Sequence, residues 1–302
     1  MRRGNVSSDL IPPFITSLIF AGSIIAAKFA VFEMDPVIII LIRYLLAIIF
    51  LLTLLPHYGL KSLKVKFADL PVFILMGLFG IVGYHYFFFS SLNYTLVNKT
   101  AIINAFSPVV TGILAAIFIN EKLSFINYTG ILIAVTGVLG LISGGDTYTL
   151  FTFDMNKGDL LMLCAVISWA IYSLIVKRYS RKFTSYSITL YSSITGVIIL
   201  TGLTFIENSW GQLKSLSTIS YLSLIYMGVL ASGVGYIFYN VSIRKIGPTK
   251  TSSAVYCFVP VVVALLAYPL FDEILNTLSL VCMILILIGL NLSLSRKSNT
   301  AT

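Results

Sequence analysis

The chain has 302 residues, of which 58% are hydrophobic and only 10% are charged, and its mean hydropathy is +0.98. A soluble protein of this size needs far more polar surface than this composition provides, so the sequence indicates a polytopic membrane protein. The formal net charge of +9 does not indicate a nucleic-acid partner, because the basic residues lie in short clusters between apolar runs and not along one polar face.

Ten apolar runs follow one another along the chain. A hydrocarbon core about 30 Å thick requires about 20 apolar residues in a helix. Breaking stretches such as Asp35-Pro36 and Gly247-Pro248 separate the runs. The predicted spans are 11–32, 36–55, 69–92, 98–118, 124–142, 158–177, 186–206, 217–243, 249–270 and 276–294. The predicted fold class is therefore all-α and integral to the membrane, with the lipid bilayer as a partner.

A motif of the first half of the chain recurs in the second half at a constant offset of 152 residues. The recurring residues are Gly83-Tyr84 and Gly235-Tyr236, Pro108 and Pro260, and Glu121 and Glu273. The repeat indicates that the chain is a duplicated half, and that each half contains five of the predicted spans. Because five is an odd number, the two copies must cross the membrane in opposite directions, as in transporters with inverted repeats.

The repeat also predicts the domain organisation. We expect a first five-helix repeat over 1–143, a connecting loop over 144–157 and a second five-helix repeat over 158–302. This connection, between the fifth and sixth spans, is the longest of the predicted loops.

The basic residues predict the orientation in the membrane. Fifteen Lys and Arg residues lie at the termini and in the loops after spans two, four, six and eight, whereas the opposite loops contain only Lys99, Lys157 and Lys214. Since positive charge is retained in the cytoplasm, both termini are predicted to be cytoplasmic, in an inner or plasma membrane protein. The count requires that the apolar run after Arg2-Arg3 is an uncleaved first span and not a secretory signal.

Short motifs occur in each half of the chain. In the first half they are Asp35-Pro36, Arg43, Gly83-Tyr84, Pro108 and Glu121-Lys122, and in the second half Trp169-Ala170, Gly235-Tyr236, Pro260 and Glu273. Together they resemble the drug/metabolite transporter superfamily, in its EamA-like branch of ten-helix transporters with two five-helix repeats. The resemblance covers nearly the whole chain. It implies movement of a small polar metabolite, commonly an amino acid or a related compound and often outward, by alternating access.

Three basic side chains lie inside the predicted spans. Lys28, Arg43 and His85 belong to the outer halves of spans one, two and three. An ionisable residue within a span costs several kcal/mol, about 2.5 to 3.5 on insertion scales, unless it is paired or solvated, so each is a functional candidate. Together they predict a positive layer that faces a central cavity and suits a substrate carboxylate.

Each of these residues also has a structural interpretation. Lys28 can extend its ammonium to the outer interface, and Arg43 can bind loop carbonyls or pair with Glu33 or Asp35. His85 can bond a neighbouring helix, although its ordinary pKa makes it the natural candidate for proton coupling. No Asp or Glu lies at mid-membrane, so the sequence does not support a carboxylate proton relay, and exchange remains an alternative to proton coupling.

Aromatic and amide side chains complete the predicted substrate site. Tyrosine combines an apolar face with a hydroxyl group, which suits amphipathic solutes, and ligand sites in inverted-repeat carriers lie near the midplane between the repeats. The alternative for each aromatic residue is interfacial anchoring or helix packing. The candidates are Tyr84, Asn104, Ser107, Trp169, Tyr172, Tyr191, Tyr236, Tyr239, Asn240 and Tyr256.

Glycine and proline predict where the spans bend. Pro108 and Pro260 each remove a backbone hydrogen bond in mid-span, and Gly83 and Gly235 allow close helix approach and bending. We expect spans three, four, eight and nine to bend at these four hinge residues, with static packing irregularity as the alternative.

These features predict a secondary transporter without catalytic chemistry. The sequence contains no P-loop motif that would indicate ATP as the energy source, and no pattern that implies a cofactor or a metal. The three cysteines lie in apolar runs without ligand spacing. Export of an amino acid or a related compound is the leading interpretation. Import or exchange of a carboxylated or nucleotide-like solute is the alternative, and a receptor or scaffold is a more remote one. The sequence indicates no oligomeric state.

Overall fold

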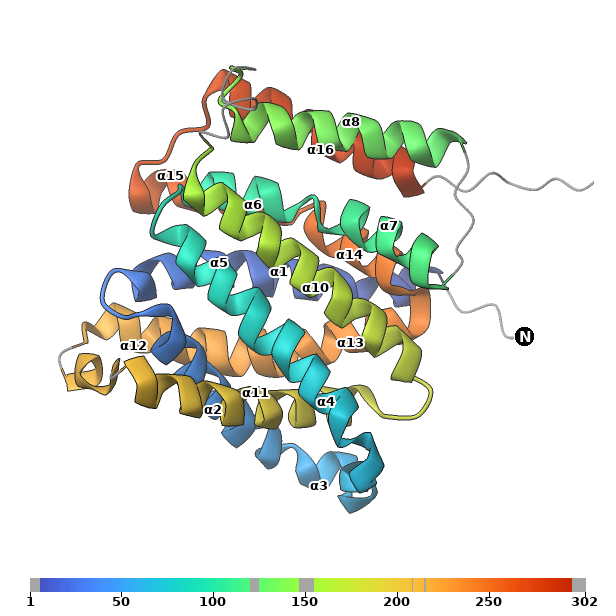
Figure 1. The fold of residues 1–302 in the computed structure, drawn as a ribbon, viewed down its shortest axis with the longest axis vertical. Helices are drawn as coiled ribbons and strands as arrows, with labels where there is room; N and C mark the ends of the chain where they lie inside the picture. The colour runs from blue at the N-terminus through green and yellow to red at the C-terminus, as the bar shows by residue number, and fades with distance from the viewer. Residues whose placement is uncertain (1–5, 120–124, 147–154, 208, 215, 295–302) are drawn as a thin grey trace, which may run out of the picture.

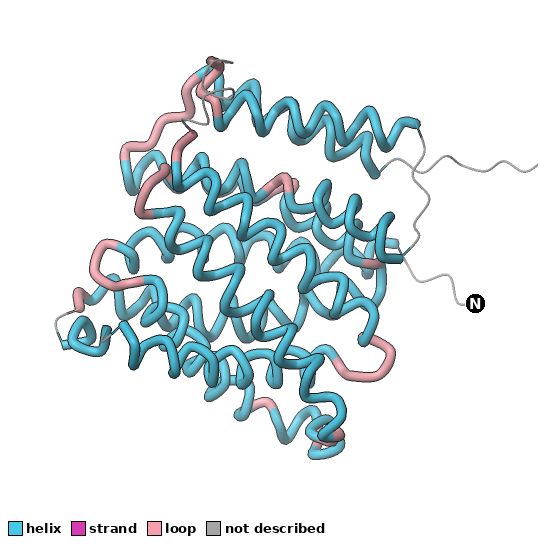
Figure 2. Tube along the Cα trace, in the orientation of Figure 1, coloured by secondary structure: helices cyan, strands magenta, loops and turns pink. Residues whose placement is uncertain are grey.

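The computed structural model describes residues 6–119, 125–146, 155–207, 209–214 and 216–294. Within these ranges the chain consists of helices joined by short loops and turns (Figure 2). The predicted all-α membrane fold is confirmed, and each predicted span is one helix or a run of consecutive helical segments. The predicted motif Glu121-Lys122, residues 147–154 of the predicted connecting loop and the charges of both termini lie outside the described residues.

The helices divide between the two halves of the chain. The first repeat contains α1 (Val6–Val31), α2 (Pro36–Thr53), α4 (Leu70–Met76), η3 (Gly77–Gly83), α5 (Tyr84–Leu92), α6 (Val97–Asn104), α7 (Ser107–Ile119) and α8 (Phe125–Ile142). The second contains α10 (Lys157–Tyr179), α11 (Ser185–Glu207), α12 (Thr218–Ile225), η5 (Tyr226–Gly235), α13 (Tyr236–Ile246), α14 (Pro248–Tyr256), α15 (Val259–Phe271) and α16 (Thr277–Leu294). The short helices α3 (Leu55–Tyr58), η1 (Leu60–Leu63), η2 (Phe67–Asp69) and η4 (Ser209–Lys214) belong to the connections.

The helices have the length and polarity of membrane spans. Nine of the described helices or helical runs are long and apolar enough to cross a bilayer, and the apolar part of α16, Thr277–Leu292, is shorter. Large hydrophobic side chains remain exposed on the outside of the bundle, for example Ile117 at 63%, Leu132 at 67% and Leu265 at 71%. Such a surface suits lipid and not water. The chain is therefore a multi-pass membrane protein, and α1 begins at the same end of the molecule at which α16 ends (Figure 1).

The packing of α8 against α16 shows that the repeats run in opposite directions. Gly137, in α8, lies against the backbone of Cys282, whereas Gly289, seven residues further along α16, lies against Gly130 and Ala134, earlier in α8. Later residues of one helix thus meet earlier residues of the other, so the two helices are antiparallel. They lie together along one side of the bundle (Figure 1).

Two irregularities occur at the same place in both repeats. The third span of each repeat contains a π-helical segment, η3 or η5, that ends at Gly83 or Gly235. The fourth span breaks between α6 and α7, and its counterpart breaks between α14 and α15. Each break lies just before a proline, Pro108 or Pro260, which occupies the first turn of the following helix, where a missing N–H costs nothing. The prolines therefore follow helix breaks and do not kink continuous helices.

Contacts between the repeats occur at both ends of the bundle. At one end, which we call the Glu273 end, the Glu273 carboxylate accepts hydrogen bonds from the backbone N–H groups of Val97, at 3.0 Å, and Asn98, at 2.9 Å. A carboxylate at the start of a helix satisfies otherwise unpaired N–H groups. At the opposite end, which we call the Lys182 end, Lys182 forms an ion pair with Asp69.

Candidate functional site

A small central cavity lies where the two repeats meet. Its volume is about 20 Å³, which is room for about one water molecule. Side chains of α1, α2, α5 and α6 line it from the first repeat, and side chains of α10 and α13 from the second. The lining residues are Phe20, Ser23, Ile24, Arg43, Tyr84, His85, Phe88, Asn104, Trp169 and Tyr236.

Arg43 supplies the charge of this cavity. It lies on α2 with only 3% of its surface exposed, and its Nε atom donates a hydrogen bond of 2.6 Å to the Ser232 hydroxyl on η5. Among the described residues, no Asp or Glu lies within ion-pair distance of Arg43. A buried cation without a counter-ion is costly, so the cavity favours an anionic group beside Arg43.

The predicted alternative that Arg43 pairs with Glu33 or Asp35 is wrong. Both acids lie at the Glu273 end and contact the segment before α12. The Glu33 carboxylate accepts a hydrogen bond of 2.8 Å from the backbone N–H of Ser217. The Asp35 carboxylate accepts one of 2.5 Å from Nε2 of Gln212. Hydrogen bonds from the Ser217 hydroxyl and backbone hold the pKa of Glu33 below its ordinary value.

His85 lies beside Arg43 on the cavity wall and is 1% exposed. Its Nδ1 atom is 3.1 Å from the backbone carbonyl oxygen of Ile81, one turn earlier. A carbonyl oxygen can only accept, so this hydrogen bond uses a proton on Nδ1. The Tyr44 hydroxyl lies 3.4 Å from the same ring, and its aromatic ring meets the imidazole edge to face.

Aromatic rings form much of the remaining cavity wall, with Trp169 at the centre of their cluster. The ring centroid of Trp169 lies 4.8 Å from those of Tyr84 and Tyr239, 5.2 Å from that of Tyr172 and 5.3 Å from that of Tyr236. The indole N–H of Trp169 is buried and makes no well-formed hydrogen bond, although the hydroxyls of Tyr239 and Tyr256 lie near it. Such a donor is rare in a folded interior and would be satisfied by a polar group of a ligand.

The predicted amide residues bond to their aromatic neighbours. Asn104 donates to the Tyr84 hydroxyl at 3.2 Å and accepts from Ser107 at 3.2 Å. Asn240 forms a separate hydrogen bond with the Tyr172 hydroxyl at 3.1 Å. Of these two groups, only Asn104 and Tyr84 line the cavity.

Several predicted candidates lie outside the cavity lining. Lys28 donates to the backbone carbonyl of Leu92 at 2.7 Å, at the end of α5, and Tyr191 donates to that of Leu63 at 2.6 Å, near the Lys182 end. Tyr239 bonds with Ser173 and Ser252, each at 3.0 Å. Tyr256 is buried, and its hydroxyl lies near the side chains of Tyr84 and Trp169 without a well-formed hydrogen bond.

Sequence reasoning missed four lining residues, Phe20, Ser23, Ile24 and Phe88. The first three share one face of α1 at spacings of three and four, and Phe88 lies one turn after Tyr84 on α5. Such spacing on spans already known to carry candidates is the signal that would have found them.

The described residues offer no cluster of three or more His, Cys, Asp or Glu side chains that would hold a metal ion. The three cysteines are free. The cavity instead combines one cation, one imidazole, three hydroxyl groups, one amide group and several aromatic rings.

A family model matches the chain over residues 11–143 and 156–295, and its description is the EamA-like transporter family. The chain is 28% identical over 224 residues to the "Uncharacterized transporter YyaM" of Bacillus subtilis, an alignment that covers 74% of this chain and 73% of the relative. An "Uncharacterized transporter" of Clostridium kluyveri is 24% identical over 99% of this chain and 96% of its own.

A third relative, from Streptantibioticus cattleyicolor, is a "Probable terminal-alkyne amino-acid exporter". It is 22% identical over 70% of this chain and 69% of its own length. Among solved structures, a protein crystal structure superposes with a TM-score of 0.72 at 16% identity, over 96% of this chain and 98% of the other. That likeness concerns the fold alone.

Proposed function

The chain belongs to the EamA-like transporter family, and we propose that it exports an amino acid or a related small metabolite by alternating access. Transport follows from the family. The substrate class, the direction and the mechanism are the parts that we infer. The proposed substrate carries a carboxylate and a compact apolar or aromatic side chain.

The observation that carries this proposal is the isolated charge of Arg43. The residue is buried at the junction of the repeats, and its one hydrogen bond to a described residue goes to a neutral hydroxyl, that of Ser232. Its guanidinium has donors left over, and a carboxylate matches their geometry in a bidentate arrangement. A substrate carboxylate would supply the negative counter-charge for Arg43 that the described residues do not supply.

The aromatic wall supports an amphipathic solute. The rings of Trp169, Tyr84 and Tyr236 offer apolar surface, and the unpaired indole N–H of Trp169 offers a donor. Aromatic faces also attract an ammonium group. An amino acid has all three matching features, namely a carboxylate, an ammonium group and a side chain. The name of the exporter from Streptantibioticus cattleyicolor agrees with this class and with outward movement.

The small size of the cavity supports alternating access. A space of about 20 Å³ holds about one water molecule and no metabolite, so a substrate requires the helices around it to move. We propose that they move about the hinge residues Gly83, Pro108, Gly235 and Pro260. These residues lie at or beside the π-helical segments and helix breaks that both repeats share.

For the orientation, we propose that the Lys182 end faces the cytoplasm of an inner or plasma membrane. The excess of basic residues in the loops at this end supports that direction.

For the driving force, exchange fits a cavity lining without an acidic residue. His85 is its one side chain that ordinarily titrates near neutral pH. Transport that needs a pH gradient and is lost in His85→Gln would favour proton coupling.

Counterflow in proteoliposomes tests the proposal directly. Vesicles loaded in turn with single amino acids, dicarboxylates and nucleotides would be assayed for uptake of the matching labelled solute, against protein-free vesicles. We expect accelerated exchange for at least one amino acid with an apolar or aromatic side chain. Exchange of a dicarboxylate or a nucleotide, with no amino acid active, would refute the amino-acid class and identify the carboxylated or nucleotide-like alternative.

A further inference from the structure

A second, larger cavity opens at the Glu273 end, between the starts of α2 and α10 and the last turns of α5. Its volume is about 440 Å³, which falls in the range of small-molecule pockets. It takes Tyr86 and Ser90 from α5 and Asn93 from the residue just after it, whereas the central cavity takes Tyr84, His85 and Phe88. At about 100° per residue these two sets face opposite sides of the helix. We call this second cavity the outer cleft.

Opposite charges stand on two walls of the outer cleft. Asp35, just before α2, is on one wall, and Lys157, at the start of α10, is on the other. Both are exposed. The Asp35 carboxylate bonds to the neutral amide of Gln212. The Lys157 ammonium lies 3.3 Å from the Tyr94 hydroxyl and 4.6 Å from the centre of its ring. Within the described ranges neither charge has an ion-pair partner.

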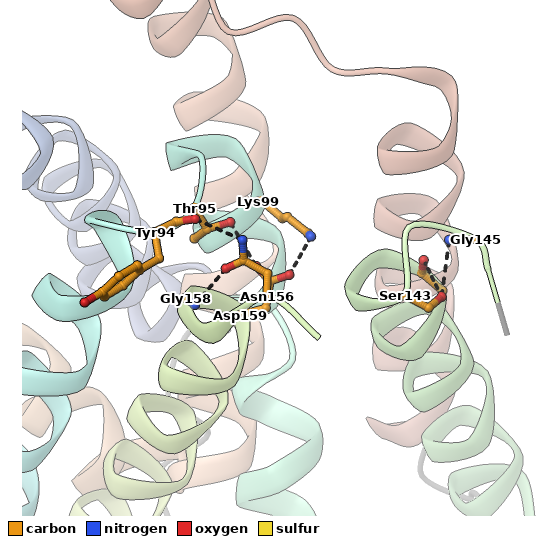
Figure 3. Close-up of polar contacts among 9 residues, drawn as sticks. Tyr94, Thr95, Lys99, Ser143, Gly145, Asn156, Gly158 and Asp159 are labelled. Carbon is orange, nitrogen blue, oxygen red and sulfur yellow. Dashed lines mark hydrogen bonds and ion pairs between the residues drawn. The ribbon is translucent and has the colours of Figure 1, made fainter. Parts of the chain in front are cut away.

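The Lys157 wall is held in place by a compact hydrogen-bond cluster (Figure 3). The Asn156 side chain accepts from the backbone N–H of Gly158 at 2.7 Å and donates to the carbonyl of Tyr94 at 3.0 Å. Next to it, the fully buried Asp159 carboxylate accepts from Thr95 at 2.9 Å and pairs with Lys99 at 2.5 Å. These contacts fix the end of α5 to the start of α10, so the wall is preformed.

The other wall is also anchored. The backbone N–H of Asp35 donates to the Gln212 side chain at 2.8 Å, while the same amide group donates back to the Asp35 carboxylate. This reciprocal pair fixes the acid to η4. Both charges are thus held by hydrogen bonds, Asp35 to Gln212 and Lys157 to Tyr94, and both line the same open cavity. A preorganised pair of opposite charges loses little entropy when a ligand binds.

We propose that the outer cleft is a binding site for a zwitterion, whose ammonium group pairs with Asp35 and whose carboxylate or phosphate pairs with Lys157. A ligand with one charge can pair with only one of these two side chains, and a neutral ligand can pair with neither. The same chemistry occurs in two sources, a free amino acid and the head group of a zwitterionic phospholipid. The inference does not depend on the central cavity, because the two sites share no lining residue.

Titration calorimetry on the full chain in nanodiscs of phosphatidylglycerol, which has no ammonium group, tests this assignment. The probes are L-leucine and dioctanoyl phosphatidylethanolamine, with n-octylamine and octanoate as single-charge controls. Arg43→Gln protein is used beside the unmodified protein, so that binding in the central cavity does not obscure the result. We expect at least one zwitterionic probe to bind with a Kd that rises about tenfold in Lys157→Gln and in Asp35→Asn.

Charge exchange provides the decisive variant. Asp35→Lys combined with Lys157→Asp should restore binding, because a zwitterion can reverse its direction in the cleft. The controls Asp272→Asn and Lys64→Gln remove exposed charges outside the cleft and should leave the Kd unchanged. If the Asp35 variants prove unstable, Lys157→Gln alone tests the charge dependence of binding. Lys157 is an exposed side chain, so its substitution should leave the fold intact.

The outcomes separate the sources and can overturn the proposal. Charge-dependent binding of leucine identifies a free amino acid, and charge-dependent binding of phosphatidylethanolamine identifies a lipid head group. The proposal is wrong if neither probe binds, if Lys157→Gln leaves binding unchanged, or if the single-charge controls bind as tightly as the zwitterions.

Discussion

The two repeats share their backbone irregularities but differ in the side chains that they bring to the centre. Both have a π-helical third span and a fourth span broken before a proline. At an offset of 152 residues, however, His85 corresponds to Ile237 and Asn104 to Tyr256. No basic residue occurs in α11, the counterpart of the helix that carries Arg43.

This difference separates two tasks. A rocking motion about a twofold axis needs matching mechanical elements in both repeats, and those are the features that the repeats share. Binding an asymmetric solute needs different groups on its two sides, and those are the features in which the repeats differ. The first repeat supplies the polar chemistry and the second supplies most of the aromatic wall, including Trp169 and Tyr236.

The largest expected effect comes from removing the polar chemistry of the first repeat. Arg43→Gln should raise the KM for a carboxylated substrate about tenfold to a hundredfold, since a hydrogen bond to a charged group contributes about 1.5 to 3 kcal/mol. Arg43→Lys should lose less, because it keeps the charge but not the bidentate geometry. Initial rates in proteoliposomes give both values.

Lys28→Gln is the matched control for Arg43→Gln. It removes another basic side chain that lies well inside a predicted span, and the Lys28 ammonium bonds the end of α5 outside the central cavity. Its KM should stay close to that of the unmodified protein. Equal losses in the two variants would show that a general positive charge, and not the position of Arg43, governs binding.

A second prediction exchanges a residue pair between the repeats. Gly80 corresponds to Ser232 at the offset of 152 residues. A Cβ atom at Gly80 would lie 2.4 Å from the Tyr172 ring, so Gly80→Ser should displace the aromatic wall and cost about 1 to 3 kcal/mol, as overpacked cores do. A lower apparent Tm in detergent, measured by intrinsic fluorescence, would show this loss.

The reverse change, Ser232→Gly, should act differently. It introduces no clash and removes the hydroxyl that orients Arg43, so it should raise KM more than it lowers Tm. If both exchanges lowered Tm equally with no change in KM, the two repeats would differ in packing and not in recognition.

A third prediction addresses the mechanical elements that the repeats share. Pro108→Ala and Pro260→Ala should leave membrane insertion intact and lower the transport rate about twofold to tenfold, because conformational steps set many turnover rates. The two variants should have similar effects, since both prolines follow equivalent helix breaks. Unchanged rates in both would contradict the hinge role and favour static packing irregularity.

The sequence predicted the spans and their inversion well, for simple physical reasons. Apolar runs of bilayer length can only be helices, and the recurrence of Gly83-Tyr84 and Pro108 fixed the register of the two copies. It did not predict that η3 and η5 are π-helical. Within η3, the carbonyl of Gly80 accepts a hydrogen bond of 2.9 Å from the Tyr236 hydroxyl of the other repeat, a contact between distant residues that the sequence alone does not show.

The central cavity was predicted less completely. Arg43, Tyr84, His85, Asn104, Trp169 and Tyr236 line it, because ionisable and amphipathic side chains in spans are rare enough to be noticed. The sequence gives the depth of a residue but not the direction in which its helix faces, so Lys28 was grouped with Arg43 although its ammonium reaches the end of α5. Phe20 and Phe88 were missed, because apolar residues in apolar helices look like ordinary packing.

The smallest expected effects come from the loops that join the repeats at the two ends. At the Lys182 end the loop after α10 pairs Lys182 with the buried Asp69. At the Glu273 end the loop after α1 places the exposed Glu33 on the backbone N–H of Ser217, just before α12. Asp69→Asn should therefore lower the apparent Tm more than Glu33→Gln, because exposed charges are screened by solvent.

The pH dependence of Glu33→Gln tests the smaller contact. Hydrogen bonds from Ser217 lower the pKa of Glu33 in the folded protein, so the carboxylate stabilises the fold above its unfolded pKa of about 4.3. That contribution disappears as the pH falls through the lower, folded pKa. The Tm difference between Glu33→Gln and the unmodified protein should therefore be present at neutral pH and vanish in acid. A difference that persisted after the carboxylate is protonated would mean that the loop acts through packing, and that the two ends differ less in electrostatics than their contacts indicate.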